Sequence, residues 1–214
     1  MRQLPTITLI GMSGSGKTYW SKKLAHLGYV HYSCDQFIAI RLSYLLQVDP
    51  LSLSDLAEWM GKPYEPDYEY KQQQYLAWES QSVIEAYHKL METDHAWVID
   101  ATGSFIYLPE DIQMLLTENT HVVVLDTPEE YLEEMYRVFL SDPKPIVWGE
   151  HYQPKPGETP EQALKRCYPE LLRWRRERYL KTGHQVMPFE FHRPKETTPE
   201  LFHQAVVDFI QQQA

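Results

Sequence analysis

The sequence contains only two cysteines, Cys34 and Cys167, among its 214 residues. Their separation does not match the short spacings of cysteine metal sites, and two thiols cannot build the disulfide framework of a small secreted protein. No apolar stretch approaches the length that spans a bilayer, and residues 1–5 lack the apolar run of a signal peptide. These absences predict a soluble cytoplasmic protein with no membrane partner.

Basic residues are also scarce, since 20 Lys and Arg stand against 30 Asp and Glu and the formal net charge is -10. Binding to the phosphate backbone of long nucleic acid requires a basic face, so we expect no nucleic-acid partner. A local basic cluster can still serve a small phosphorylated ligand. The sequence shows no internal repeat, and its length suits one α/β domain with insertions. We therefore expect residues 1–214 to form a single domain and a monomer.

Residues 11–18, Gly-Met-Ser-Gly-Ser-Gly-Lys-Thr, match the phosphate-loop pattern G-x-x-x-x-G-K-[ST]. Glycines let successive backbone amides turn inward around a polyphosphate. Lys17 can reach the β- and γ-phosphates, and the Thr18 hydroxyl can hold Mg²⁺. The motif predicts ATP and Mg²⁺ as cofactors. The expected nucleotide-binding residues of the loop are Gly11, Ser13, Gly14, Ser15, Gly16, Lys17 and Thr18.

Short apolar runs alternate with longer helical patterns along the chain. The runs that predict buried strands are 7–10, 29–32, 96–99, 121–125 and, more weakly, 185–189. The patterns that predict helices are 19–27, 36–46, 72–91, 129–140, 161–181 and 199–212, the last with Thr198 as its cap. This alternation predicts an α/β protein of three layers, with a five-stranded, mostly parallel sheet. Ligands of such sheets bind beyond the carboxyl ends of the strands, where the phosphate loop lies.

Two proline-rich segments interrupt this alternation. Residues 48–75 contain three prolines and several aromatics, and residues 141–160 contain five prolines and two glycines. Long loops inside compact domains are often lids or binding loops. We interpret 48–75 as a substrate-binding insert and 141–160 as a lid, with plain surface loops as the alternative.

Three aspartates follow predicted strands and are candidates for chemistry. Asp100 ends the third strand, where a carboxylate commonly holds Mg²⁺ together with the loop threonine. Asp126 has a similar position, but the Asp-Thr-Pro-Glu stretch it begins favours a helix cap. Asp35 can orient an acceptor hydroxyl and take its proton, or it can merely cap the helix that begins at Gln36.

Cations are concentrated in one predicted helix, which contains Arg173, Arg175, Arg176 and Arg178. These four cannot all share one helix face, so some must be solvated. One or two can reach a substrate, where forked guanidinium donors suit several oxygens. Arg137 and Lys144 are the other candidates.

The order of these parts resembles shikimate kinase, within the nucleoside monophosphate kinase group of phosphate-loop folds. Residues 33–38 resemble that family's D-x-D stretch, and the resemblance implies that Asp35 contacts the substrate. Gly103 and Ser104 resemble the start of its glycine-rich substrate loop. Lys144 occupies the place of the lid arginine. In residues 175–179, which resemble R-x-x-x-Y, the resemblance implies that Arg175 binds the substrate carboxylate; it also implies that Arg137 lies against adenine.

The sequence also departs from that family. Ser33 replaces the first aspartate of D-x-D, and Leu76 stands where the family has a second arginine for the substrate acid. Loss of a buried charge partner costs several kcal/mol, as a rough figure, so we expect an acceptor other than shikimate. The aromatic residues of the insert either pack or line a larger, flatter acceptor site. They are Trp59, Tyr64, Tyr68, Tyr70, Tyr75 and Trp78.

These observations together predict a kinase that transfers a phosphoryl group from ATP to a hydroxyl of a small anionic metabolite. The predicted catalytic residues are Lys17, Asp35, Lys144 and Arg175; the metal residues are Thr18 and Asp100; the substrate residues are Asp35, Gly103, Ser104 and Arg175. Two alternatives remain open at this stage. One is a nucleoside or nucleotide kinase, and the other is a degenerate nucleotide-binding module that regulates a partner.

Overall fold

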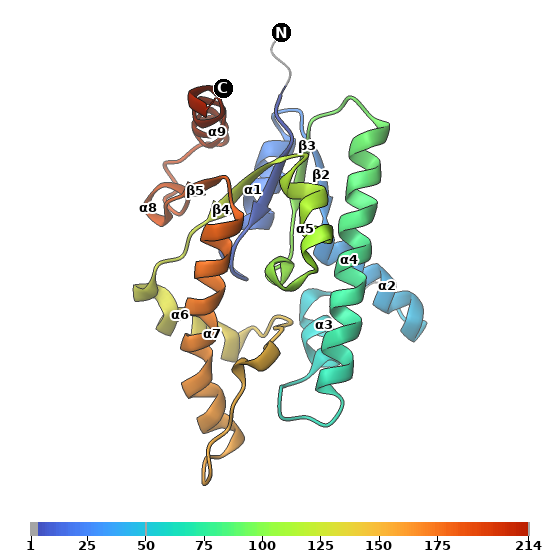
Figure 1. The fold of residues 1–214 in the computed structure, drawn as a ribbon, viewed down its shortest axis with the longest axis vertical. Helices are drawn as coiled ribbons and strands as arrows, with labels where there is room; N and C mark the ends of the chain where they lie inside the picture. The colour runs from blue at the N-terminus through green and yellow to red at the C-terminus, as the bar shows by residue number, and fades with distance from the viewer. Residues whose placement is uncertain (1–3, 50, 214) are drawn as a thin grey trace.

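The structure is a computed structural model that describes residues 4–49 and 51–213. Five strands form one sheet in the order β2-β3-β1-β4-β5, and all neighbouring strands are parallel (Figure 1). They are β1 (Ile7–Ile10), β2 (Val30–Ser33), β3 (Trp97–Asp100), β4 (His121–Leu125) and β5 (Gln185–Met187). The five predicted strands are confirmed. The predicted domain 1–214 also includes residues 1–3, 50 and 214, which lie outside the described residues.

Nine helices and three short 3₁₀ turns are found in the described part of the chain. The helices are α1 (Lys17–Ala25), α2 (Cys34–Leu46), α3 (Leu53–Met60), α4 (Tyr68–Glu92), α5 (Glu110–Thr117), α6 (Leu132–Ser141), α7 (Pro160–Thr182), α8 (Phe189–His192) and α9 (Pro199–Gln213). The predicted helices correspond to α1, α2, α4, α6, α7 and α9. Thr198 does cap α9, because its hydroxyl accepts the Leu201 amide at 3.2 Å. Three short helices, α3, α5 and α8, were not predicted because each is too short for a clear 3.6-residue period.

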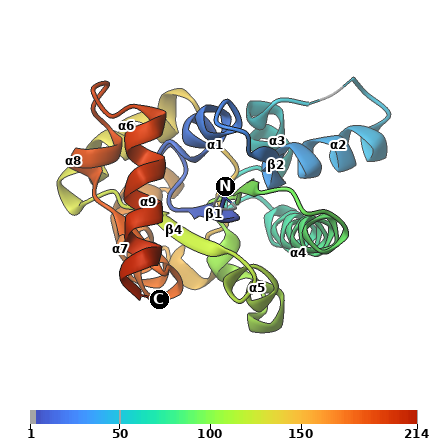
Figure 2. The same ribbon diagram turned by 90° about the horizontal axis from the view of Figure 1, so that it is seen from above.

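The sheet lies between two helical layers, and side chains of its strands alternate between them. In Figure 2, α1 and α4 lie on opposite sides of the sheet. Ile7 and Leu9 of β1 pack with Trp20 of α1 and Phe202 of α9, whose rings stack 4.3 Å apart. Ile10 faces the other layer, in the larger core that α2, α4 and α7 cover. The predicted three-layer α/β/α arrangement is confirmed.

The segment 48–75 is mostly helical rather than a loop. Ser52 begins α3 with a capping box, in which its hydroxyl accepts the Asp55 amide and the Asp55 carboxylate accepts the Ser52 amide. α4 begins at Tyr68, four residues before the predicted start. In Figure 1, α3 lies beside the lower part of the long helix α4. Pro63 made the segment resemble a loop in the sequence, but it lies in the turn between α3 and α4 and interrupts neither helix.

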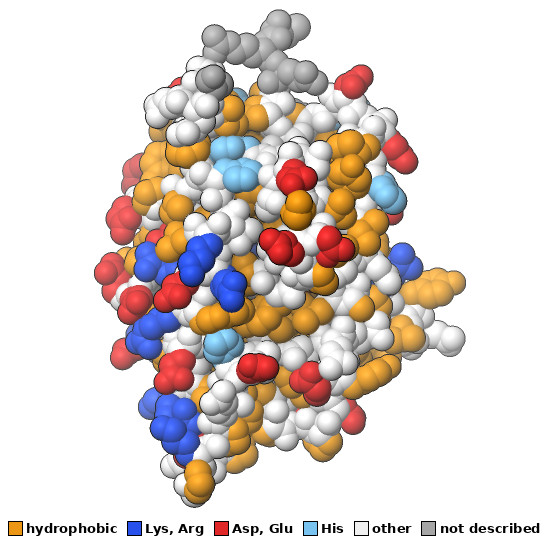
Figure 3. Space-filling view, in the orientation of Figure 1, with side chains coloured by type: hydrophobic (Ala, Val, Ile, Leu, Met, Phe, Trp, Pro, Cys, Tyr) orange, Lys and Arg blue, Asp and Glu red, His pale blue; other side chains and the backbone are white. Residues whose placement is uncertain are grey.

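No helix among residues 4–49 and 51–213 has both the length and the apolarity to cross a membrane. Cys34 and Cys167 are both buried and free, so neither is paired in a disulfide. On the face shown in Figure 3, most Lys and Arg side chains lie over the part that α6 and α7 occupy, with acidic side chains among them. Basic and acidic side chains are therefore interspersed on that face.

Gly183 allows the end of α7 to pass close to the sheet. Its φ of -78° is ordinary, yet a Cβ built on it lies 2.1 Å from Cγ2 of Val124 on β4. We predict that Gly183→Ala lowers the free energy of unfolding by about 1–3 kcal/mol, the usual cost of overpacking a core. Urea denaturation measures it. The matched test is the double variant with Val124→Ala: if the two losses simply add, this clash is not the cause.

Candidate active site

The phosphate loop joins β1 to α1 and depends on three glycines with positive φ. Gly11 has φ 144°, Gly14 has 79° and Gly16 has 101°. A Cβ at Gly11 would lie 2.7 Å from the Leu125 carbonyl oxygen, so only glycine permits this approach of the loop to β4. Gly16 is the N-cap of α1 and brings the helix N-terminus to the loop. The loop thus has the geometry of an anion-binding turn.

Lys17 lies at the first position of α1, and its side chain folds back over the loop. Its ammonium donates to the carbonyl oxygens of Gly11 and Met12, both at 2.9 Å, and the residue is 6% exposed. Burial lowers its pKa below the ordinary value, while the charges of Asp100 and Asp35 act in the opposite direction. A polyphosphate in the loop would stabilise the charged ammonium further.

Asp100, at the end of β3, is fully buried, and neither carboxylate oxygen has a hydrogen-bond partner among the described residues. The nearest basic side chain is His31, whose Nε2 lies 3.8 Å from Oδ2. A buried carboxylate without a donor is costly unless a cation compensates it. Thr18 at the start of α1 offers a hydroxyl in the adjoining cavity. Oxygen ligands of this kind fit Mg²⁺, which binds through one or two protein oxygens and the phosphates of its nucleotide.

Asp35 lies in the first turn of α2, yet it does not cap that helix. The cap is Ser33, whose hydroxyl accepts the Gln36 amide at 3.3 Å. The Asp35 carboxylate instead accepts a hydrogen bond from the Tyr75 hydroxyl at 3.2 Å. Burial, with the nearby charge of Asp100, raises the pKa of Asp35 to about 6. The sequence left open whether Asp35 caps the helix, and the structure shows that Ser33 does so.

Glu79 is a buried acid that the motifs did not single out as functional. It is 0% exposed, and the hydroxyls of Thr102 and Ser104 both donate to its carboxylate. Burial raises its pKa to about 7, against the effect of these hydrogen bonds. The signal in the sequence was a pair of hydroxyl residues, Thr102 and Ser104, shortly after the end of β3 at Asp100. Ser104 was predicted to bind substrate; in the structure its hydroxyl donates to Glu79 and so joins the 101–104 turn to α4.

Gly103, which was predicted to bind substrate, lies close to the phosphate loop. A Cβ there would be 3.3 Å from the Ser13 amide nitrogen and 3.8 Å from a guanidinium nitrogen of Arg175. Its carbonyl accepts a hydrogen bond from the Tyr179 hydroxyl. Because Gly103 has no side chain, the turn can approach the phosphate loop closely. This close approach explains why glycine occupies the position.

Arg175 differs from its predicted placement, because its guanidinium is held behind Gly103 rather than on the cavity wall. The residue is 2% exposed; Nη2 donates to the Val147 carbonyl at 2.6 Å, and the guanidinium lies 5.2 Å from the Tyr107 ring centre. It forms no ion pair within the described residues. Of the other helix arginines, Arg173 and Arg176 pair with acids and Arg178 lies over Trp174.

Arg137 and Asp126 also lie in unexpected surroundings. The Arg137 side chain is 72% exposed on α6 and pairs with Glu134 at 3.2 Å, and it does not line the catalytic cavity described below. A turn of Glu129–Tyr131 precedes α6, and Pro128, not Asp126, is its N-cap. The Asp126 carboxylate accepts two hydrogen bonds from Arg176, at 2.7 and 2.8 Å. Asp126 therefore joins α7 to the end of β4 and is not free for a metal.

A cavity of about 220 Å³ lies above the phosphate loop, and we call it the catalytic cavity. Its charged residues are Lys17, Asp35 and Lys144, as predicted for one site. Its other walls are Ser13, Gly14, Gly16, Thr18, Tyr19, Leu53, Tyr75, Gly103 and Pro145. Gly11 and Ser15 do not line it, because they lie inside the loop. The cavity thus joins the phosphate loop, the insert and the segment that carries Lys144.

The predicted lid is fixed to the body at two places. Its centre is buried: the Tyr68 hydroxyl donates to the Ile146 carbonyl at 2.7 Å, and Gln72 Oε1 accepts the amides of Trp148 and Gly149 at 2.8 and 3.0 Å. Together with the bond from Arg175, these contacts form what we call the latch. Side chains thereby satisfy backbone groups that no strand or helix pairs. Lys144 lies two residues before the latch and forms an ion pair with Asp142 at 2.7 Å.

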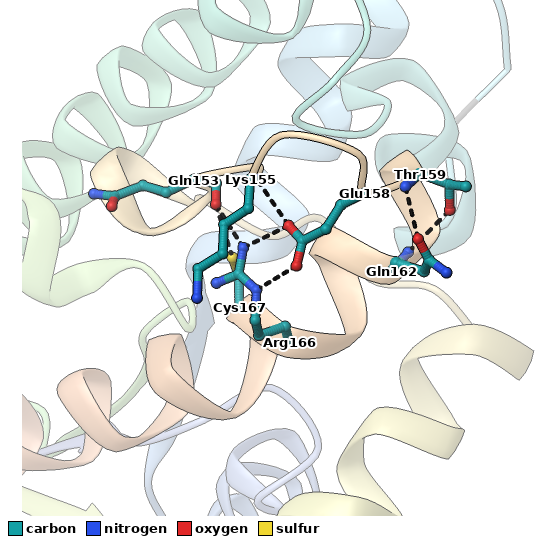
Figure 4. Close-up of polar contacts among 7 residues, drawn as sticks. All are labelled: Gln153, Lys155, Glu158, Thr159, Gln162, Arg166 and Cys167. Carbon is teal, nitrogen blue, oxygen red and sulfur yellow. Dashed lines mark hydrogen bonds and ion pairs between the residues drawn. The ribbon is translucent and has the colours of Figure 1, made fainter.

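The later part of the segment is held to α7 (Figure 4). Arg166 makes two hydrogen bonds to the Glu158 carboxylate and one to the Gln153 carbonyl, each 2.7 Å long. Thr159 and Gln162 form a capping box at the start of α7. The prolines therefore mark an ordered connection between α6 and α7 rather than a free loop.

Neither a family model nor a curated protein matches the sequence. Solved structures do match the fold. A shikimate kinase from Acinetobacter baumannii, in complex with shikimate, is 21% identical with a TM-score of 0.60 over 98% of this chain and 94% of that one. A shikimate kinase from Bacteroides thetaiotaomicron is 16% identical, also with a TM-score of 0.60, over 97% and 98%. A deoxyadenosine kinase from M. mycoides with bound dATP is 15% identical, with a TM-score of 0.51 over 95% of this chain and 99% of that one.

The chain has a shikimate kinase-like P-loop kinase fold. Within this fold, two departures noted in the sequence have a structural counterpart. Ser33 serves as the cap of α2, and the carboxylate that most raises the pKa of the loop lysine is Asp100 on the neighbouring strand. Leu76 packs, half-buried, against the larger core.

The hydrogen bond from Tyr75 to Asp35 predicts a pH effect in the candidate active site. The donor stabilises the carboxylate and holds the pKa of Asp35 below the value that burial alone would set. An Asp35 base is active when deprotonated, so activity should rise with pH through about 6. Tyr75→Phe should move this acidic limb to higher pH. The pH profile of kcat/KM measures it, and a limb that stays in place or moves to lower pH would contradict the assignment.

The latch predicts a stability effect with a matched control on the same helix. Tyr68→Phe leaves the buried Ile146 carbonyl without its donor, and an unsatisfied buried group costs about 1–3 kcal/mol. Tyr70→Phe, at a residue 70% exposed, should change stability by less than about 0.5 kcal/mol. Urea denaturation and limited proteolysis of residues 141–160 measure the two variants. Equal behaviour of the two would show that the segment is not held by Tyr68.

Proposed function

We propose that the protein transfers the γ-phosphoryl group of ATP, bound with Mg²⁺, to a hydroxyl group of a small molecule. The observation that carries the proposal is the catalytic cavity, in which Lys17 of the phosphate loop faces the same space as Asp35 and Lys144. The similar solved structures of kinases support it through the fold. A cytoplasmic, monomeric enzyme remains our expectation from the sequence.

Each residue has a stated task in this proposal. The loop amides and Lys17 bind the β- and γ-phosphates, and Lys144, which lines the same cavity, binds the γ-phosphate. Thr18 and Asp100 are the oxygen donors that would hold Mg²⁺, which neutralises charge on the phosphates. Asp35 accepts the hydroxyl proton of the acceptor. The acceptor oxygen forms the new bond to phosphorus as the bond to the β-phosphate oxygen breaks, and ADP leaves.

Positioning and charge supply most of the catalysis in such a reaction. The Tyr75 hydroxyl orients Asp35, and the latch fixes the segment that carries Lys144. A closed wall also keeps out water, which otherwise competes as the acceptor. The predicted acid-binding role of Arg175 requires the guanidinium to leave the Val147 carbonyl, so our proposal for the acceptor does not depend on it.

Two substitutions test the proposal. Lys17→Ala removes a charged donor to the phosphates and should weaken MgATP binding at least about tenfold, since such bonds contribute about 1.5–3 kcal/mol. Asp35→Asn should lower kcat by about 10²–10⁴-fold, the usual range for a general base, with MgATP affinity nearly unchanged. Calorimetry measures binding, and ADP release measures turnover with a panel of alcohols that includes shikimate and deoxyadenosine.

The outcomes separate the alternatives. A nucleoside as the best acceptor identifies a nucleoside kinase. MgATP binding without turnover on any acceptor, unaffected by Asp35→Asn, would identify a nucleotide-binding module without catalysis. Absence of MgATP binding by folded protein would overturn the whole assignment.

A further inference from the structure

A second cavity of about 490 Å³ lies beside the catalytic cavity, and we call it the side cavity. Its walls come from α3, residues 61–65, α6, residues 143–148 and the start of α7. Its volume is within the range of small-molecule binding sites and exceeds that of the catalytic cavity, at about 220 Å³. The proposed transfer reaction assigns no task to it.

The two cavities adjoin. Lys144 lines both of them. On the insert side, Leu53 lines the catalytic cavity while the next residue, Ser54, lines the side cavity. We take this shared boundary as the place where a molecule with a hydroxyl beside Asp35 would extend past Lys144 into the side cavity.

The inner wall of the side cavity is apolar and aromatic. It includes Tyr136, Phe139, Ile146 and Trp148. The Phe139 and Trp148 rings meet edge to face with centres 6.5 Å apart, and Trp148 is 1% exposed. The latch holds the Trp148 amide, so this wall is a formed surface rather than a gap between mobile loops. Such a wall suits a flat apolar group.

The outer wall carries an excess of negative charge. Glu58, Glu65 and Glu161 line it, and none of the three forms an ion pair in the part of the chain that the structure describes. The positive charge of Lys144 is compensated by Asp142 at 2.7 Å. Lys62 is the other basic residue of the lining, and its ammonium lies 5.8 Å from the Tyr64 ring centre. Aromatic rings combined with carboxylates attract organic cations and repel anions.

We propose that the side cavity binds the non-reacting part of the acceptor, and that this part is an aromatic or apolar group bearing a protonated amine. This inference rests on the proposed function for the identity of the reacting hydroxyl. It names the acceptor class as an aromatic amino alcohol, in place of the anionic metabolite predicted from the position of Arg175.

Three small alcohols that share one phenyl-bearing carbinol and differ in one substituent, which is cationic, neutral or anionic, test the inference. They are 2-amino-1-phenylethanol, 1-phenylethane-1,2-diol and mandelate, which carry an ammonium, a neutral hydroxyl and a carboxylate on the same phenyl-bearing carbon framework. We expect the amine to bind about tenfold more tightly than mandelate, with the diol between them, as cation–π and charge attraction predict. Ligand-observed NMR titration of the full chain measures the dissociation constants without any nucleotide.

Matched variants locate the binding. Ala57 is 8% exposed and lines the side cavity, so Ala57→Phe should fill it and remove binding of the amine. Ala77→Phe, at an exposed position of α4, is the control and should leave binding unchanged. If Ala57→Phe fails to fold, the double variant Glu58→Gln with Glu161→Gln provides the test. These residues are exposed, and their replacement should remove the preference for the amine over the diol.

Equal or tighter binding of mandelate would overturn the inference, as would amine binding that folded Ala57→Phe leaves unchanged. The assay contains no ATP, so its result is independent of catalysis. The effect of Lys17→Ala on MgATP affinity is measured separately, by calorimetry. Failure of the proposed function and failure of the side cavity therefore give different results.

Discussion

The site depends on the burial of charge at the carboxyl end of the parallel sheet. Lys17 is buried against the carbonyls of its own loop, and Asp100 is buried on the next strand with no hydrogen-bond partner among the described residues. Desolvation acts against every charge placed there, as the directions of the pKa of Lys17 and of Asp35 show. In the function that we propose, a polyphosphate and its metal ion supply the opposite charges that offset this cost. The proposed function thus gives the buried charges at this edge of the sheet a physical reason.

A second constraint concerns the long connection between α6 and α7, whose backbone is paired by side chains. Tyr68, Gln72 and Arg175 satisfy four consecutive residues, 146–149, that belong to no strand or α-helix. Burial without these partners would cost each polar group its hydration. The same three side chains connect the insert and α7 to the wall of the catalytic cavity. Side chains of α4 and α7 therefore hold this segment in place, and they thereby position Lys144.

The closeness of the two cavities follows from the same arrangement. The latch places Trp148 and Ile146 in the wall of the side cavity, and Lys144 between the two spaces. The insert supplies the opposite wall through α3, whose capping box fixes where that helix begins. In our proposals, recognition of the acceptor and binding of the γ-phosphate therefore involve one set of packed elements. A substitution in the latch should alter both.

Local sequence determined the phosphate loop, the five strands, the six longer helices and the carboxylates that follow β2 and β3, because glycine dihedral freedom and hydrophobic periodicity act over a few residues. Only tertiary structure decided which partner each charged side chain has. Arg175 contacts Val147, Asp126 contacts Arg176, and Ser104 contacts Glu79, across separations of 28, 50 and 25 residues. It also ordered the proline-rich segment, since the side chains that satisfy its backbone lie on distant helices. No local pattern encodes such contacts, because they exist only once the layers have packed.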